Sequence, residues 1–515
     1  MCEIINIFYI KVTKLETRPN ILIINSDQQR FDTLSCYGND WIQTPNLNNL
    51  AKDSFVFENA YVTQPVCAPS RASLLTGLYP HTHGAVGNGI RLDSGTKTIT
   101  ELIPDDYQKI CHGKWHHTEP QQGFEKMTTA HFPQIEGNDY SDLSDYHKWL
   151  ISKGVNFPDT NKVEENQQVF AVFQNNLPEE LTQASFIAEL TSKEILDIKE
   201  NTKPFLLLAN FYEPHSPFTG PLNGLYDPEK IPVGPAFAKK PENVSHYNTS
   251  RAEDDETGYN QSFIDGVHKS VHVNDSITSC DGCYDLSDEM GWRELRANYM
   301  ANVTLLDKYV GKVLDALSES GQAENTIVVF TSDHGDMLGD HRHLQKRSFY
   351  EESSKVPFLI KVPWISKEQK FVSGNISLVD LLPTLLDLID QKIPENLQGS
   401  SRKKVLLGQE NLDDNDVFFE WNGVGNIDLN KQTIGVTQDD KNGISSTPRR
   451  CIVSSDRWKL TVSPNDSAEL FDLNNDPNEL TNKISDPSCK SRISLMENKI
   501  KRWQIQTEDY EKILD

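Results

Sequence analysis

Residues 19–27 read Pro-Asn-Ile-Leu-Ile-Ile-Asn-Ser-Asp, a continuous apolar run that polar residues close abruptly. Such a run is typical of a strand that is buried on both faces, as in an α/β sheet covered by helices. Residues 204–215 (Pro-Phe-Leu-Leu-Leu-Ala-Asn-Phe-Tyr-Glu-Pro-His) and 326–335 (Thr-Ile-Val-Val-Phe-Thr-Ser-Asp-His-Gly) repeat the pattern. Ligands bind outside the carboxyl ends of strands in open α/β sheets. The three runs therefore predict a polar site at one edge of the sheet.

Helices are expected between and after these strands. Apolar residues recur at three- and four-residue steps from Tyr299 to Leu317, and Gly321 then ends the pattern, which predicts an amphipathic helix. Residues 378–389 predict another helix, in which Pro383 would introduce a kink. By contrast, residues 235–291 are rich in Asp, Asn, Ser and Gly and predict a long polar surface insertion, either an idle loop or part of a substrate rim.

The pattern changes near residue 395 from alternating strands and helices to short strands. Residues 457–462 and 468–473 flank a Ser-Pro-Asn-Asp turn and predict a β-hairpin. The expected fold class is α/β, with a large mixed, mostly parallel sheet sandwiched by helices and a smaller C-terminal α+β domain containing a short antiparallel sheet. The expected division is an N-terminal extension at 1–17, a main domain at 18–395 and the smaller domain at 396–515.

Composition excludes some partners. The 515 residues contain 50 Lys and Arg against 75 Asp and Glu, a formal net charge of −25. This charge repels nucleic acid and anionic membranes, so neither is expected as a partner. No apolar run approaches the ~20 residues that span a bilayer, so membrane insertion is not expected either. An anionic substrate would need a local basic pocket.

Signals for cellular location are mixed. The N-terminus has Glu3 where a signal peptide would be basic, and no clear cleavage site follows. Seven Asn-x-Ser/Thr sequons point towards a secretory, lysosomal or extracellular location, which stays open. They begin at Asn243, Asn248, Asn260, Asn274, Asn302, Asn375 and Asn465. Eight cysteines are too few for a disulfide scaffold, and the isolated Cys280-x-x-Cys283 predicts a loop disulfide or two free thiols rather than zinc.

Residues 67–71 read Cys-Ala-Pro-Ser-Arg and open a predicted helix. Alone, this cysteine could be a buried thiol. However, Gly-Lys-Trp-His at 113–116, Pro-His-Ser-Pro at 214–217 and Ser-Asp-His-Gly-Asp-Met-Leu-Gly-Asp-His at 332–341 accompany it. Together with residues 469–480, these motifs resemble the type I, formylglycine-dependent sulfatases of the alkaline-phosphatase-like superfamily. The resemblance extends over about residues 18–485 and implies a sulfuric ester hydrolase.

The resemblance assigns catalytic roles to six residues. A formylglycine-generating enzyme would convert Cys67 into formylglycine (3-oxoalanine), whose hydrate attacks sulfur. His116 would accept a proton from the second hydroxyl, and Arg71 would hold the diol. Lys114 and Lys346 would bind sulfate oxygens, and His215 would protonate or hydrogen-bond the leaving oxygen. His81, His83 and His117 match no catalytic role.

The resemblance also implies one divalent cation, held by Asp27, Gln28, Cys67, Asp333 and His334. Carboxylate and amide oxygens suit Ca²⁺. The His334 nitrogen is a poorer calcium ligand, and Gln28 replaces a second aspartate, so Mg²⁺ and Mn²⁺ stay open.

Two other functions are alternatives to sulfate ester hydrolysis. The same scaffold, with an Asp-Gln metal motif, occurs in hydrolases of phosphonate monoesters and phosphodiesters. A non-catalytic relative could bind sulfated glycans, but it should have lost the nucleophile or metal residues that this chain retains. The substrate is expected to be a sulfated small molecule or sulfated sugar; its alcohol half and the oligomeric state stay open.

Overall fold

A computed structural model of the protein describes residues 18–116, 123–130, 144–155, 177–198, 203–216, 218–252, 272–273, 276–277, 284, 286–423 and 447–514. The expected extension at 1–17, the Cys280-x-x-Cys283 pair and His117 lie outside these residues.

A nine-stranded mixed sheet forms the centre of the molecule, with the order β11-β2-β10-β8-β1-β5-β3-β4 and β9 paired to β2. Its strands are β1 (Asn20–Ser26), β2 (Phe55–Tyr61), β3 (Gln108–Gly113), β4 (Lys126–Thr129), β5 (Phe205–Asn210), β8 (Thr326–Ser332), β9 (Lys355–Val356), β10 (Phe358–Lys361) and β11 (Lys370–Ser377). Strands β8, β1 and β5 are parallel neighbours. The three apolar runs therefore do lie side by side, and the mixed, mostly parallel sheet is confirmed.

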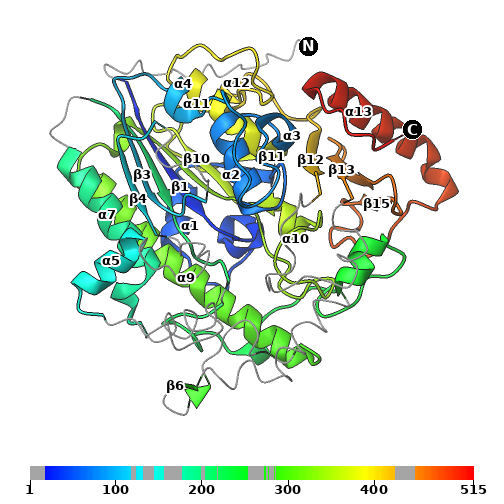
Figure 1. Ribbon diagram of the computed structural model, residues 1–515, viewed down its shortest axis with the longest axis horizontal. Helices are drawn as coiled ribbons and strands as arrows, with labels where there is room; N and C mark the ends of the chain where they lie inside the picture. The colour runs from blue at the N-terminus through cyan, green and yellow to red at the C-terminus, as the bar shows by residue number, and fades with distance from the viewer. Residues whose placement is uncertain are drawn as a thin grey trace, which may run out of the picture.

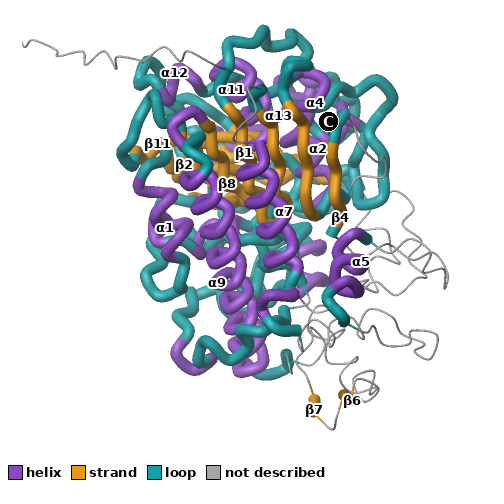
Figure 2. The backbone as a smooth tube through the Cα atoms, turned by 90° about the vertical axis from the view of Figure 1, so that its left-hand side faces the viewer, coloured by secondary structure: helices purple, strands orange, loops and turns teal. Residues whose placement is uncertain are grey.

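Helices cover both faces of this sheet (Figure 2). One face carries α1 (Pro45–Lys52), α7 (Gln183–Ile198) and α9 (Glu289–Glu319), whose Leu47, Ile187 and Leu306 belong to one apolar core. The other carries α2 (Cys67–Thr76), α4 (Ile99–Leu102) and α11 (Leu381–Leu388), with Leu75, Ile99 and Leu385 in a second core. The remaining helices and turns of this part are η1 (Phe31–Thr33), η2 (Ser35–Tyr37), α3 (Pro80–His83), α5 (Asp145–Ser152), η4 (Glu179–Leu181), η5 (Pro228–Lys230), η8 (Ala323–Asn325), α10 (Glu351–Ser354), η9 (Leu378–Asp380) and α12 (Lys403–Leu406). Burial on both sides explains why the strands read as continuous apolar runs.

The two predicted helices form, with corrections to both. Helix α9 begins ten residues before Tyr299, where Asp288 caps its first turn by accepting a hydrogen bond from the backbone N–H of Met290. The predicted helix at 378–389 is divided into η9 and α11, a 3₁₀ turn followed by an α-helix. Pro383 lies in the first turn of α11, where a missing backbone N–H costs nothing, so it starts the α-helix instead of kinking it.

A four-stranded antiparallel sheet lies beside the large sheet (Figure 1). It contains β12 (Val417–Trp421), β13 (Arg449–Val453), β14 (Trp458–Val462) and β15 (Glu469–Asp472), followed by η11 (Pro487–Cys489) and α13 (Lys490–Thr507). Strands β14 and β15 pair as the predicted hairpin. The smaller α+β part is thus confirmed, whereas a boundary at residue 395 stays a prediction.

The described part of the 235–291 insertion is not simply a surface loop. Phe237 is buried and forms an isolated β-bridge with Asp340. Residues 246–252 are helical and bury Tyr247, and two short strands, β6 (His272–Val273) and β7 (Ser276–Ile277), pair with each other. Polar composition concealed these contacts, because few apolar residues make them.

Two structural facts bear on location. Among the sequon asparagines that the structure describes, Asn248, Asn302 and Asn375 are buried and cannot carry a glycan in the folded protein. Within the described ranges, no helix is both long and apolar enough to cross a membrane.

Candidate active site

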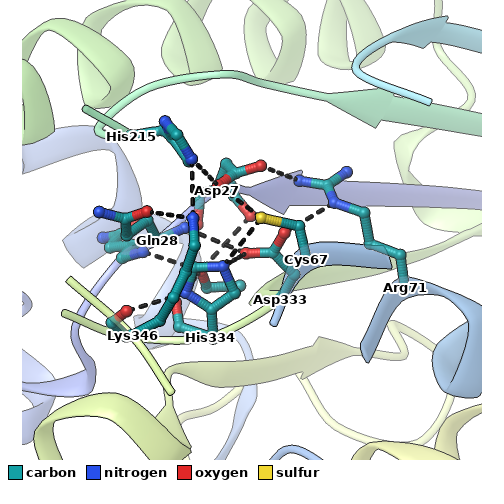
Figure 3. Close-up of polar contacts among 12 residues, drawn as sticks. Asp27, Gln28, Cys67, Arg71, His215, Asp333, His334 and Lys346 are labelled. Atoms are coloured by element: carbon teal, nitrogen blue, oxygen red, sulfur yellow. Dashed lines mark hydrogen bonds and ion pairs between the residues drawn. The ribbon is translucent and has the colours of Figure 1, made fainter. Parts of the chain in front are cut away.

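The predicted site residues converge at the carboxyl ends of the central strands (Figure 3). Asp27 follows β1, Asp333 follows β8, and His215 lies five residues beyond the end of β5. The sheet brings these side chains together because the three strands are adjacent and parallel. The N-terminus of α2 faces the same edge and supplies Cys67 as its first residue.

Cys67 lies at the centre of the site and is fully buried. Its Sγ is 3.2 Å from His334 Nε2, 3.8 Å from Lys114 Nζ and 3.9 Å from Asp27 Oδ1. Burial raises the pKa of this thiol, but the charges of Lys114, Lys346 and His334 outweigh it and hold the pKa well below the usual range. The position thus favours a nucleophile that develops negative charge.

Arg71 lies one helical turn beyond Cys67 and binds both carboxylates. Its Nε donates to Asp333 Oδ2 at 2.7 Å, and its Nη2 donates to Asp27 Oδ2 at 2.9 Å. The Oδ1 atoms of Asp27 and Asp333 face the interior of the site. In the structure the guanidinium fixes the spacing of the two carboxylates. That Arg71 also holds the diol stays a prediction.

Lys114 enters the site from the end of β3. Its Nζ is 2.5 Å from Asp27 Oδ2 and 5.1 Å from the ring centre of Tyr212. Gly113 has φ +101°, and a Cβ there would lie 2.0 Å from the Asn210 carbonyl oxygen, so the turn that aims Lys114 requires glycine.

His116 completes the Gly-Lys-Trp-His motif. Its buried ring lies close enough to Cys67 for the two side chains to influence each other's pKa. Burial, followed by the charge of Lys114, lowers its pKa below the usual value. A neutral imidazole beside Cys67 can accept a proton, which is the role predicted for it.

Lys346 connects Gln28 with His215. Its Nζ donates to Gln28 Oε1 at 2.7 Å and lies 2.8 Å from His215 Nε2. Burial and then the charges of Lys114 and Lys346 lower the pKa of His215 to about 4. Its ring is therefore neutral, and it can accept a hydrogen bond from Lys346. The Gln28 oxygen, predicted as a metal ligand, is hydrogen-bonded to Lys346 in this structure.

The donor set fits a divalent cation. One potential ligand atom from each of Asp27, Cys67, Asp333 and His334 lies within 4.8 Å of all the others, and all four residues are buried. His334 Nδ1 lies 2.9 Å from the Gly335 carbonyl oxygen; donating to it leaves the Nε2 lone pair towards Cys67. Two carboxylates, one imidazole and the side chain at position 67 are a suitable ligand set.

Sequence reasoning assigned no role to Asp336 or Tyr212. Asp336 Oδ2 accepts a hydrogen bond from Gln28 Nε2, which orients the Gln28 amide. Asp336 stands in the same motif as Asp333, so its position within 332–341 was an available signal. Tyr212, by contrast, precedes the Pro-His motif with no distinguishing pattern.

Comparison with known proteins agrees with this site. Residues 19–391 match the sulfatase family, and residues 339–506 match the C-terminal part of N-sulphoglucosamine sulphohydrolase. An arylsulfatase of Clostridium perfringens is 30% identical over 497 residues, which cover 93% of each chain.

Two solved structures share the fold. A phosphonate monoester hydrolase from Silicibacter pomeroyi superposes with a TM-score of 0.75 at 23% identity, covering 96% of each chain. A protein solved with its substrate D-glucosamine-2-N,6-O-disulfate has a TM-score of 0.69 at 22% identity, covering 96% of this chain and 99% of the other. The chain belongs to the sulfatase family, and the alkaline-phosphatase-like fold and the enzymatic class expected from its motifs are confirmed.

Proposed function

We propose that the protein hydrolyses a sulfate monoester to an alcohol and inorganic sulfate through a formylglycine at position 67. The observation that carries this is the placement of Cys67, the first residue of α2, within one buried cluster with Asp27, Asp333 and His334. The thiol then stands for the aldehyde hydrate that a formylglycine-generating enzyme would produce. Neither hydroxyl of such a hydrate is present in the cysteine side chain.

The aldehyde hydrate has two hydroxyls with separate tasks. One hydroxyl would lose its proton as its oxygen attacks sulfur, and the sulfur–oxygen bond to the alcohol would break while the departing oxygen takes up a proton. The second hydroxyl would then lose its proton, and the aldehyde would form again as the carbon–oxygen bond to the sulfate breaks and sulfate departs. His116, neutral and close to position 67, accepts that second proton.

The sulfate needs positive charge because its oxygens shield the sulfur. Lys114, beside Asp27, and Lys346, beside Gln28, supply this charge, and the N-terminus of α2 adds a partial positive charge. His215 Nε2 lies beside Lys346, so it would first take up a proton from that lysine and then donate it to the leaving oxygen.

Asp27, Asp333 and His334, with Gln28 beside them, would hold the divalent cation. A cation there supplies Lewis acidity and orients the sulfate towards the nucleophile. Ca²⁺ fits the two carboxylates, and the His334 nitrogen keeps Mg²⁺ and Mn²⁺ as alternatives.

Phosphonate monoester and phosphodiester hydrolysis is the second candidate, because a phosphonate monoester hydrolase has the same fold and Gln28 follows Asp27 here. The test compares kcat/KM for an aryl sulfate and an aryl phosphonate monoester. We expect the sulfate to be preferred, and a preference for the phosphonate would overturn the proposal.

Two cysteine variants make that test specific. Cys67→Ala should abolish aryl sulfate hydrolysis, whereas Cys36→Ala should retain it, because Cys36 lies outside the site. Residual Cys67-independent turnover would contradict the assigned nucleophile. A wild type that binds sulfated glycans but hydrolyses no sulfate ester would instead indicate a non-catalytic relative.

A further inference from the structure

A second pocket lies where residues 245–252 pack against the antiparallel sheet. It encloses about 330 Å³ including its open mouth, and its lining includes Arg347, Arg449 and Tyr247. Ser467, at the tip of the β14–β15 hairpin, lines it and is exposed, so the pocket opens to solvent. No residue of this pocket has a role in the chemistry described above.

Arg449 is the unusual member of this pocket, because among the residues that the structure describes its buried guanidinium forms no salt bridge. Its residue is 5% exposed, and its Nη2 has no hydrogen-bond partner. The guanidinium carbon lies 3.4 Å from the ring centre of Tyr247 and 5.4 Å from that of Trp421. Burying a charged group without a hydrogen-bonded counterion is costly, so such an arrangement calls for a ligand.

The neighbouring arginine shows how this fold satisfies a guanidinium that has a structural role. Arg450 is also buried, and it donates to both oxygens of Asp509, at 2.7 and 2.9 Å. Arg449 stacks on aromatic rings instead, which holds the guanidinium plane in place while an N–H group stays available.

The charges of Asp466 and Glu469 favour the protonated form of Arg449, but neither carboxylate forms a salt bridge with it among the described residues. Asp466 accepts hydrogen bonds from the backbone N–H groups of His246 and Tyr247. Glu469 accepts from the backbone N–H of Ser245 and from the Asn248 amide. Both carboxyl groups therefore accept hydrogen bonds at the start of the helical segment 246–252.

Backbone contacts tie this pocket to the reaction centre. Arg347 follows Lys346 directly, so their Cα atoms are about 3.8 Å apart. The Arg347 N–H donates to the carbonyl of Pro65, two residues before Cys67, and Tyr247 Oη donates to the carbonyl of Arg347. The pocket thus adjoins the chain segments that carry the nucleophile and a sulfate-binding lysine.

We propose that this pocket, the Arg449 pocket, binds a second acidic substituent, a sulfate or carboxylate, of the substrate whose sulfate ester is hydrolysed at Cys67. The proposal rests on the proposed function and specifies its substrate class as molecules with at least two anionic groups. Planar guanidinium groups suit such oxyanions. A chain with a net charge of −25 needs a local cationic group of this kind to hold a second anion.

Crystals soaked in inorganic sulfate test the pocket directly. We expect sulfate against Arg449 in the wild type and none there in Arg449→Gln. Sulfate bound in the reaction centre but absent from the Arg449 pocket of the wild type would overturn the proposal. Arg449→Lys, which keeps the charge, covers the case in which the glutamine variant does not fold, and it should bind sulfate more weakly than the wild type.

Inhibition of aryl sulfate hydrolysis distinguishes a substrate group from a free anion. The probes are N-acetyl-D-glucosamine 6-O-sulfate and D-glucosamine-2-N,6-O-disulfate, which differ only in the neutral acetyl or acidic sulfate group on the 2-nitrogen. The wild type should bind the disulfate more tightly, and Arg449→Gln should reduce this preference by about 10- to 100-fold, the value of one charge-assisted hydrogen bond. Arg502→Gln, an exposed arginine on α13, is the matched control and should leave the preference unchanged.

The outcomes separate this proposal from the proposed function. An unchanged preference in Arg449→Gln, with sulfate still bound in wild-type crystals, would indicate a pocket for a free anion and would overturn the substrate assignment alone. Failure of the wild type to hydrolyse any sulfate ester would refute the proposed function, whatever the crystals contain.

Discussion

Asp27 and Asp333 are two buried carboxylates that share one guanidinium. Arg71 donates a hydrogen bond to the Oδ2 atom of each. The Oδ1 atom of Asp27 lies near Cys67, and that of Asp333 lies near His334. A single arginine on the nucleophile's own helix therefore fixes both the carboxylate spacing and the approach of Cys67. This coupling gives a reason for an arginine one helical turn after Cys67.

Replacement of Arg71 by lysine tests this coupling. A lysine can reach only one carboxylate, so at least one charge-assisted hydrogen bond of about 1.5–3 kcal/mol is lost. We expect kcat/KM for an aryl sulfate to fall by about 10- to 100-fold. Arg402→Lys is the matched control, because Arg402 binds the carboxylate of Asp380 away from the site. If the Arg71 variant keeps wild-type kcat/KM, the positioning role is wrong.

At this scale the sequence predicted that the site residues come together, because each stands in a motif or directly after a buried strand; their roles stay predictions. It did not predict which atoms they contact. Arg71 donates to two carboxylates, and Gln28 accepts a hydrogen bond from Lys346. Side-chain partners depend on the three-dimensional approach of several loops, which spacing along the chain does not encode.

Among the elements, the ends of the parallel strands β1, β3, β5 and β8 and the N-terminus of α2 bring the site together. The apolar runs predicted β1, β5 and β8 because burial on both faces leaves an unambiguous pattern. Residues 246–252 were missed because their contacts are mainly polar, through Asp466 and Glu469. Polar surface segments that fold against a distant hairpin carry no periodic signal.

A charged contact connects α3 with β12 and α13. His81 Nδ1 is 2.6 Å from Glu420 Oε2, and its Nε2 is 3.0 Å from the Thr507 carbonyl. The carboxylate of Asp509 lies close to His81 and Glu420, and Arg450 donates a hydrogen bond to it. Burial lowers the pKa of His81, but the charge of Glu420 outweighs it and raises the pKa above the ordinary 6.5.

This contact predicts a pH-dependent stability. Because the folded-state pKa of His81 is raised, its contribution is complete below the unfolded value of 6.5 and is lost as pH rises through the folded value. The pKa of Glu420 is lowered, so its contribution is lost only in acid. We expect His81→Gln to cost about 1–2 kcal/mol near pH 6 and less as pH rises. Denaturant titrations at several pH values measure this, and a pH-independent difference would refute the charged contact.

For the whole molecule, the sequence predicted the two-sheet architecture and the sulfatase family, which the fold and the relatives confirm. The acidic chain carries its positive charge for the substrate in a few buried positions, Lys114 and Lys346 among them. The Arg449 pocket could not be predicted, because residues 245–252, 347 and 449–469 come together only in the tertiary fold.

Cation binding should stabilise the folded protein, since the ligand cluster exists only when β1, β8 and α2 meet. A cation at about 100 times its Kd stabilises by about 2.7 kcal/mol. We therefore expect Ca²⁺ to raise the Tm of the wild type and EDTA to lower it. Asp333→Asn should abolish most of this shift, with K⁺ at equal ionic strength as the salt control. An equal Ca²⁺ shift in the variant would place the cation elsewhere.

The most direct test of the account is peptide mass spectrometry at position 67, on catalytically active protein purified from its native host. The account predicts formylglycine, with the cysteine –CH₂SH replaced by an aldehyde that reacts with a hydrazide probe. Fully active protein with an unmodified thiol at Cys67 would contradict it.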